Sequence, residues 1–160
     1  MLKIVLFSLC LGISIPLHIE QVVHRDRTKL INYISDKYSL SSLKVENIVA
    51  KVTGLVDAKF PRKTDVLAII EIESNFKSKA VSSAGAKGLM QILYKKTTTD
   101  KDNIVAGIAL LREYRRRLGS EEAAIHAYNV GIGNYKKGLR VSNYYAKYVI
   151  AKKNISKHSV

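Results

Sequence analysis

Hydrophobic positions recur at helical spacing in the first third of the chain. Between about Arg25 and Phe60 apolar residues lie three or four positions apart, a pattern that favours two helices over strands. Ser41 or Ser42 is a typical N-cap for the second helix. The apolar residues of this segment are suited to helix packing, and the segment contains no group of residues that suggests catalysis or ligand binding. The pattern therefore predicts that residues 17–60 form a helical extension supporting the rest of the chain.

A third helix is expected after Pro61. Thr64 is a suitable N-cap residue, and Asp65 follows in the first turn, where the helix dipole favours an acid. The apolar run that follows is long enough for about three turns. It leads directly into an acidic pair and then into a loop rich in serine, glycine and alanine.

Helical phase separates the two glutamates of that pair. Val66, Ile69 and Ile70 form one apolar stripe, and Glu73 lies within the stripe, whereas Glu71 points to another face. A carboxylate on a buried stripe has either a charged partner or the raised pKa that a general acid needs. These residues alone leave both interpretations of Glu73 open.

The loop after the acidic pair contains two glycines three positions apart, Gly85 and Gly88, which permit a close approach of the backbone to a ligand. Residues 88–93 are expected to form a short helix with the polar Gln91 among apolar neighbours. Residues 94–99 form a polar connector. The arrangement suits a groove that holds a substrate beside a carboxylate.

The second half of the chain also has helical periodicity. Asp100 or Asp102 starts a helix that ends near Leu118, and Ser120 starts another. A second glycine-containing turn follows, and a last helix runs from about Val141 to Lys152. Because no run of strand-like alternation and no internal repeat is present, we expect a mainly α fold with a single domain.

The net charge of the chain favours anionic partners but does not select one class of them. The chain has 160 residues, 47% of them hydrophobic, and a formal net charge of +14. Such a charge attracts nucleic acid, anionic lipid or a carboxylate-bearing cell-wall glycan. An arginine run is typical of either a nucleic-acid patch or a solvated helix face, and it comprises Arg112, Arg115, Arg116 and Arg117.

The cysteines and histidines indicate neither a disulfide nor a metal site. Cys10 is the only cysteine, and the four histidines are scattered singly. The spacing that a zinc site requires is absent. We therefore expect no metal and no cofactor.

Residues 1–16 resemble a signal peptide or a short N-terminal anchor. A basic start at Lys3 precedes about a dozen mostly apolar residues, fewer than the roughly 20 of a membrane span. The alternative is a buried N-terminal strand or helix. On the first interpretation the protein is exported to the periplasm or the cell envelope.

Three ordered motifs occur between residues 73 and 149. They are Glu73-Ser74-x-Phe76 with Ser82, Gly85 and Gly88-Leu89-Met90-Gln91-Ile92; Ala127-Tyr128-Asn129-x-Gly131-x-Gly133; and Tyr145 in Tyr-Ala-Lys-Tyr-Val. Asn103-Ile104-x-Ala106-Gly107 lies between the first and the second. Together the motifs resemble one family, the soluble lytic transglycosylase domains of the lysozyme-like superfamily. The resemblance covers about residues 61–152 and implies a helical domain that cleaves peptidoglycan. The remaining residues, 153–160, are expected to form a basic tail.

The resemblance also implies roles at the matching positions. Glu73 would act as the single catalytic acid and base, and Tyr145 would orient its carboxylate through a hydrogen bond. Among the substrate-binding residues, Ser82 and Gln91 would contact the sugar beside the cleaved bond. Tyr128 and Asn129 would line the groove near Glu73. The chain departs from the family after Ile92, where Leu93-Tyr94 replaces the usual Met-Pro and the following connector is short.

The expected reaction cleaves the β-1,4 bond between N-acetylmuramic acid (MurNAc) and N-acetylglucosamine (GlcNAc) and leaves a 1,6-anhydro-MurNAc end. The alternatives are a hydrolytic muramidase of the same fold and a non-catalytic glycan-binding assembly protein. A nucleic-acid-binding module is supported by charge alone. The expected partner is a peptidoglycan glycan strand, and the sequence leaves open a place in a secretion, conjugation or phage assembly.

Overall fold

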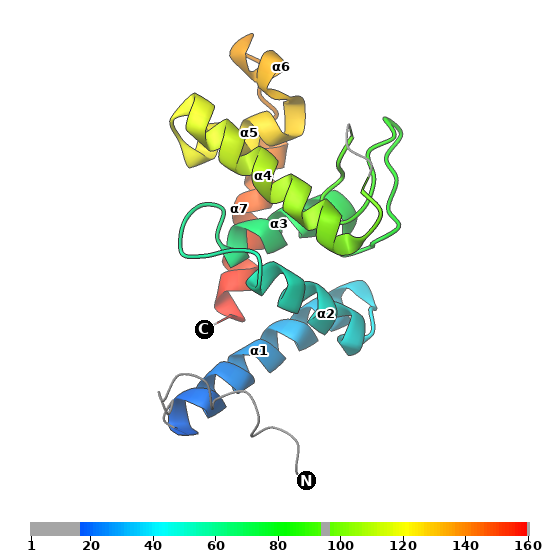
Figure 1. The fold of residues 1–160 in the computed structure, drawn as a ribbon, viewed down its shortest axis with the longest axis vertical. Coiled ribbons are helices and arrows are strands. Elements are labelled where there is room, and N and C mark those ends of the chain that lie inside the picture. The colour runs from blue at the N-terminus through cyan, green and yellow to red at the C-terminus, as the bar shows by residue number, and fades with distance from the viewer. Residues whose placement is uncertain (1–16, 94–96, 160) are drawn as a thin grey trace.

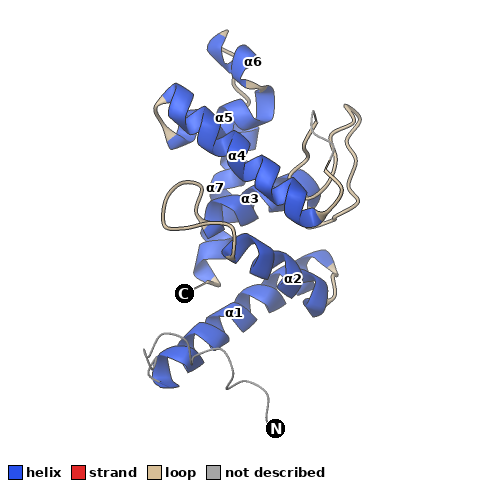
Figure 2. Ribbon diagram, viewed as in Figure 1, coloured by secondary structure: helices blue, strands red, loops and turns tan. Residues whose placement is uncertain are grey.

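The computed structural model describes residues 17–93 and 97–159 (Figure 1). Within these ranges the chain is helical, with two isolated β-bridges and no strand (Figure 2), which confirms the predicted mainly α fold. The helices are α1 (Leu17–Tyr38), α2 (Ser42–Thr53), α3 (Lys63–Ser74), α4 (Asp100–Leu118), α5 (Glu121–Val130), α6 (Ile132–Lys136) and α7 (Ser142–Lys157).

The predicted signal peptide or anchor at residues 1–16 lies outside the described residues. None of the helices in residues 17–93 and 97–159 has both the length and the apolar character required to cross a membrane.

Helix α3 is the most completely buried element of the fold. Every residue from Asp65 to Glu71 is buried, and Leu67, Ala68 and Ile69 have no exposed surface. The sequence predicted an apolar stripe on one face. The structure corrects this, because other parts of the chain cover α3 on nearly every side, as its continuous apolar run allows.

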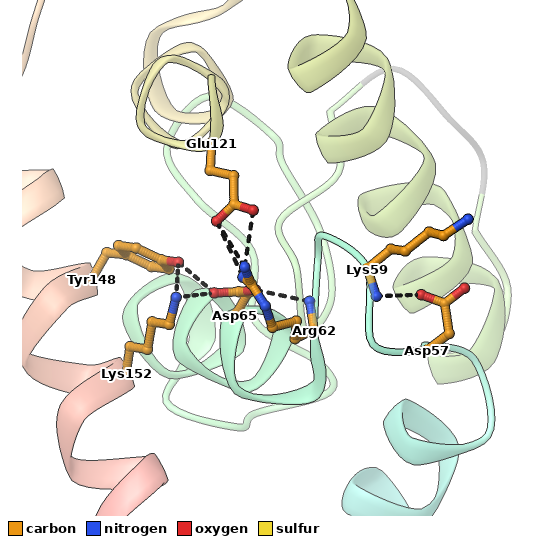
Figure 3. Close-up of polar contacts among 7 residues, drawn as sticks. All are labelled: Asp57, Lys59, Arg62, Asp65, Glu121, Tyr148 and Lys152. Atoms are coloured by element: carbon orange, nitrogen blue, oxygen red, sulfur yellow. Dashed lines mark hydrogen bonds and ion pairs between the residues drawn. The ribbon is translucent and has the colours of Figure 1, made fainter. Parts of the chain in front are cut away.

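The start of α3 is held by the buried carboxylate of Asp65. The predicted N-cap at Thr64 is wrong, since the helix begins at Lys63 and the capping position is Arg62. Asp65 Oδ2 accepts a hydrogen bond from the backbone N–H of Arg62 at 2.8 Å. Asp65 Oδ1 accepts one from the hydroxyl of Tyr148 and pairs with Lys152 Nζ, each at 2.6 Å (Figure 3).

This cluster joins three helices. The Arg62 guanidinium binds both Asp65 and Glu121 of α5 at 3.0 Å, while Tyr148 and Lys152 come from α7. Burial alone would raise the pKa of Asp65, but the hydrogen bonds from Lys152, Tyr148 and Arg62 outweigh burial and lower that pKa. The carboxylate is therefore charged in the folded protein and ties α3 to its neighbours.

Helices α1 and α2 pack together and join the remainder of the chain. Ser41 caps α2 by accepting a hydrogen bond from the N–H of Lys44 at 3.4 Å, which confirms one of the two predicted caps. Lys37 of α1 forms a 2.7 Å ion pair with the buried Glu71. The extension thus contacts the face of α3 that Glu71 occupies.

Helix α7 extends further than predicted. It runs to Lys157 and not to Lys152, so most of the predicted basic tail at 153–160 belongs to a helix. The physical reason is that Ile155 is fully buried and the ring of His158 stacks on Tyr33 of α1 at 4.2 Å. These contacts supply the burial that a free basic tail would lack.

We expect Asp65→Asn to lower the free energy of unfolding by about 3 kcal/mol at pH 7, because it removes one charge from a buried pair and leaves Lys152 unpaired. Urea denaturation monitored by circular dichroism measures the loss. Asp57→Asn is the matched control, since this exposed carboxylate only accepts a hydrogen bond from the backbone N–H of Lys59, and a change of about 0.5 kcal/mol or less is expected.

The stability difference between wild type and Asp65→Asn should also depend on pH. The folded-state pKa of Asp65 lies below its unfolded value of about 3.9, so its stabilising contribution is present above that pH and is lost as the pH falls through the folded-state pKa. The difference in stability between wild type and Asp65→Asn should therefore shrink below about pH 4. A difference that stays constant in this range contradicts the assignment.

Candidate active site

A groove of about 640 Å³ is lined by Glu73, by the loop 82–93 and by residues of α4 and α5; we call it the Glu73 groove. Its volume lies within the usual range for ligand sites. The predicted residues that line it are Glu73, Ser82, Gln91, Tyr128 and Asn129. The structure thus brings together five of the six residues singled out from the sequence.

Glu73 lies near the C-terminal end of α3, where the apolar run stops. Asn75 ends the helix in a left-handed conformation with φ of 49°, and the following Phe76 is fully buried. Asparagine tolerates this conformation better than most residues. The turn anchors the end of α3 while leaving the half-buried Glu73 side chain in contact with the groove.

The Glu73 carboxylate accepts a hydrogen bond from a tyrosine and has no ion-pair partner among the described residues. The hydroxyl of Tyr144 donates to Glu73 Oε1 at 2.6 Å. Burial raises the pKa of Glu73 above its ordinary value, and the hydrogen bond from Tyr144 opposes this rise only in part. Glu73 therefore holds a proton more readily than an exposed glutamate does.

The hydrogen bond from Tyr144 corrects the prediction for Tyr145. The Tyr145 ring instead stacks on His126 of α5 with ring centroids 4.8 Å apart, and it does not line the Glu73 groove. Successive residues of a helix point about 100° apart, so only one of two neighbouring tyrosines can face Glu73. The sequence shows the two adjacent tyrosines, but it does not show how α7 is rotated about its axis and hence which of the two faces Glu73.

The neighbouring acid, Glu71, has a different environment. It is 5% exposed and pairs with Lys37, whereas Glu73 faces the groove. The prediction that Glu71 points to another face is therefore confirmed.

The loop 82–93 does not contain the predicted short helix at 88–93. Residues 88–91 form a turn closed by the backbone pair Lys87 and Ile92, which exchange hydrogen bonds of 3.0 and 3.2 Å. Gln91 has a positive φ of 49°, which a continuing α-helix does not permit. Leu89 and Met90 of the predicted helix instead point into the core individually, where both are fully buried, whereas Leu93 is exposed.

Ser82 and Gln91 hold the loop in shape as well as lining the groove. Ser82 Oγ accepts a hydrogen bond from the N–H of Ala86 at 3.0 Å. Gln91 Nε2 donates to the carbonyl oxygens of Ala80 and Gly88 at 3.1 and 2.9 Å. Both side chains therefore reach the groove from positions fixed by the loop backbone.

Asn103 connects this loop to α4. Its side chain accepts from the N–H of Met90 at 2.7 Å and donates to the carbonyl of Lys87 at 2.9 Å, and it is almost fully buried. A Cβ added to Gly88 would come within 2.6 Å of the Asn103 amide. Gly107, one turn further along α4, likewise leaves room for the Met90 side chain. Packing and hydrogen bonding thus account for Gly88, Asn103 and Gly107, which belong to two of the sequence motifs.

Tyr128 links the loop to α5. Its hydroxyl donates to the carbonyl of Met90 at 2.7 Å. Burial, and then the nearby negative charge of Glu73, raise the pKa of Tyr128 well above its ordinary value. Tyr128 thus remains neutral beside Glu73, and the adjacent Asn129 is exposed at the groove.

Sequence reasoning missed three residues of the site. Tyr144 holds Glu73, while Glu113 and Tyr114 line the groove from α4. The helical spacing of Ala106, Leu110 and Glu113 was visible in the sequence, but the sequence did not show that this face borders a groove.

In a comparison with protein families, residues 61–150, more than half of the chain, match the family described as Transglycosylase SLT domain. This match confirms the resemblance found in the sequence, and the mainly helical architecture is consistent with a small lysozyme-like domain. No solved structure gives a significant match to the chain.

We expect Asn103→Asp to destabilise the protein by about 1–3 kcal/mol, because the carboxylate cannot donate to the Lys87 carbonyl and places a charge at a position that is almost fully buried. Hydrogen exchange should show faster exchange in residues 87–92. Asn47→Asp, at an exposed position of α2, controls for the added negative charge. Equal losses in the two variants would show that Asn103 does not hold the loop.

Proposed function

The chain belongs to the transglycosylase SLT domain family, and on that premise we propose that it cleaves the MurNAc–GlcNAc β-1,4 bond and forms a 1,6-anhydro-MurNAc end. The family itself indicates a transglycosylase-type, peptidoglycan-lytic function and a peptidoglycan substrate. The observation that supports the finer proposal is the half-buried Glu73 carboxylate, held by Tyr144 in the groove.

One carboxylate is sufficient for this reaction. Protonated Glu73 donates its proton to the glycosidic oxygen as the bond from that oxygen to MurNAc C1 breaks. The resulting carboxylate takes the proton of the MurNAc C6 hydroxyl, whose oxygen forms the new bond to C1. Glu73 ends the cycle protonated, and no water is consumed.

The hydrogen bond from Tyr144 assigns different tasks to the two oxygens of Glu73. Oε1 accepts from Tyr144, so Oε2 is the atom that carries the proton and faces the substrate. Burial raises the pKa of Glu73, which favours the protonated form that the first step requires. Glu113, the other carboxylate among the described residues lining the groove, is paired with Arg116 and Arg117, so its oxygens already have partners.

Sugar binding is assigned to four side chains of the groove. With Nε2 of Gln91 bound to the loop backbone, its Oε1 atom would accept a hydrogen bond from the sugar. Ser82 and Asn129 would supply further polar contacts, and Tyr128 would form part of the wall beside Glu73.

The proposed substrate implies a place in the cell. Peptidoglycan lies outside the cytoplasmic membrane, so we propose that the protein is exported to the periplasm or cell envelope, with residues 1–16 as signal or anchor. Membership of a secretion, conjugation or phage assembly remains compatible with this proposal.

We expect Glu73→Gln to reduce the release of muropeptides from purified peptidoglycan by about a thousandfold, because the amide can neither donate nor accept the proton in the two steps. Mass spectrometry should find 1,6-anhydro-MurNAc ends in the wild-type products. Glu122→Gln, an exposed position of α5, is the control and should retain activity.

The product masses separate the alternatives. Reducing MurNAc ends would identify a hydrolytic muramidase. Activity that survives in Glu73→Gln would refute the assigned mechanism, and strand binding by the wild type without any cleavage would indicate a glycan-binding protein.

The neighbouring tyrosines of α7 provide a second test. Tyr144→Phe removes the hydrogen bond that favours the charged form of Glu73, so the pKa of Glu73 should rise further. The decline of kcat/KM at alkaline pH should then move to higher pH. The rate should also fall by about one or two orders of magnitude, because the carboxylate is less well oriented.

Tyr145→Phe is the matched control for Tyr144→Phe. Its hydroxyl does not bind Glu73, so the pH profile should coincide with that of the wild type. A shift in Tyr145→Phe, or a shift of Tyr144→Phe to lower pH, would contradict the arrangement.

A further inference from the structure

The Glu73 groove follows one face of α4. Ala106, Ala109, Leu110 and Glu113 line it at the spacing of a single helical face. Arg117 follows Glu113 by four positions, so it lies on nearly the same face one turn beyond the end of the lining. The groove therefore leads toward the arginine-rich end of α4.

Two arginines lie directly at this end of the groove. Arg116 Nη2 is 2.9 Å from Glu113 Oε2, and Arg117 Nη1 is 3.7 Å from Glu113 Oε1. Their side chains are 72% and 42% exposed, so both guanidinium groups are accessible. One carboxylate cannot neutralise two guanidinium groups. This edge of the groove therefore carries a net positive charge.

We propose that Arg116 and Arg117 bind the carboxylates of the peptide stems carried by the glycan strand; this inference rests on the proposed function. Peptide stems branch from the MurNAc units and must leave the groove at its edge. Guanidinium groups bind carboxylates with two parallel hydrogen bonds. The pair thus recognises the peptide part of the substrate, while Glu73 and its neighbours act on the sugar.

Glu113 is a partner of the two arginines that a carboxylate of the substrate can replace. An exposed ion pair between a carboxylate and an arginine contributes little to stability, so a carboxylate of the substrate can replace Glu113 at small cost. Glu113 also gathers both guanidinium groups at the groove edge before the substrate arrives. The site is therefore a preorganised pair of cations.

Arg115 provides a matched control on the same helix. It lies two positions after Glu113, about 160° away around the axis of α4, and so on the face opposite the groove edge. Replacing it removes a positive charge from the same end of α4. If only the total positive charge mattered, Arg115→Gln would weaken binding as much as replacement of Arg116 or Arg117.

The experiment compares two substrates. One consists of glycan strands with intact peptide stems, and the other of the same strands after an amidase has removed the peptides. For the double variant Arg116→Gln with Arg117→Gln, we expect KM to rise about fivefold on peptide-bearing strands, with kcat unchanged. On peptide-free strands the double variant should match the wild type, and Arg115→Gln should match the wild type on both substrates.

Binding measured in the Glu73→Gln background separates this inference from the proposed function. There the double variant Arg116→Gln with Arg117→Gln should lower affinity for peptide-bearing strands alone, and added salt should reduce its difference from the parent protein. If the wild type cleaves neither substrate but this binding difference persists, the proposed reaction fails and the carboxylate site stands.

Three results would overturn the inference. The first is an equal loss on strands with and without peptides, and the second is no loss on either. The third is preferential binding of duplex DNA that the double variant abolishes, which would identify the arginines as a nucleic-acid contact.

Discussion

The buried carboxylate of Asp65 is the interaction on which the site depends. It receives Tyr148 and Lys152 from α7, and Tyr144 lies four residues before Tyr148 on the same helical face. Fixing α7 against the start of α3 therefore also fixes Tyr144 against Glu73 near the end of α3. The orientation of the proposed acid is set by a charge cluster two helical turns away from it.

The two glutamates near the end of α3 show how environment assigns roles. Glu71 and Glu73 are two positions apart, yet one forms an ion pair with Lys37 and the other accepts a hydrogen bond from the neutral Tyr144. An ion pair keeps a carboxylate charged, whereas burial beside a neutral donor allows it to hold a proton. The extension of α1 and α2 thus supplies the ion-pair partner of Glu71, through Lys37, whereas Glu73 lines the groove.

The loop that forms the opposite wall is held from behind by packing. Asn103 and Tyr128 bind the backbone on both sides of Met90, and Gly107 leaves the space that the Met90 side chain fills. The polar groove residues Ser82 and Gln91 are consequently attached to a rigid turn. A motif that resembles a helical segment in the sequence is in fact a turn shaped by its contacts with α4 and α5.

The sequence by itself determined the mainly helical fold, the family, the ends of α4 and the placement of Glu71 and Glu73 on different faces of α3, because apolar spacing, capping residues, motifs and helical phase are local properties. Tertiary structure alone decided that Tyr144 and not Tyr145 binds Glu73, that residues 88–91 form a turn, and that α7 continues to Lys157. The hydrogen bond to Glu73 joins residues 71 positions apart. Which tyrosine forms this bond depends on the rotation of α7 relative to α3. That rotation is set by the contacts of α7 with Asp65 and the core, and no local sequence pattern reports it.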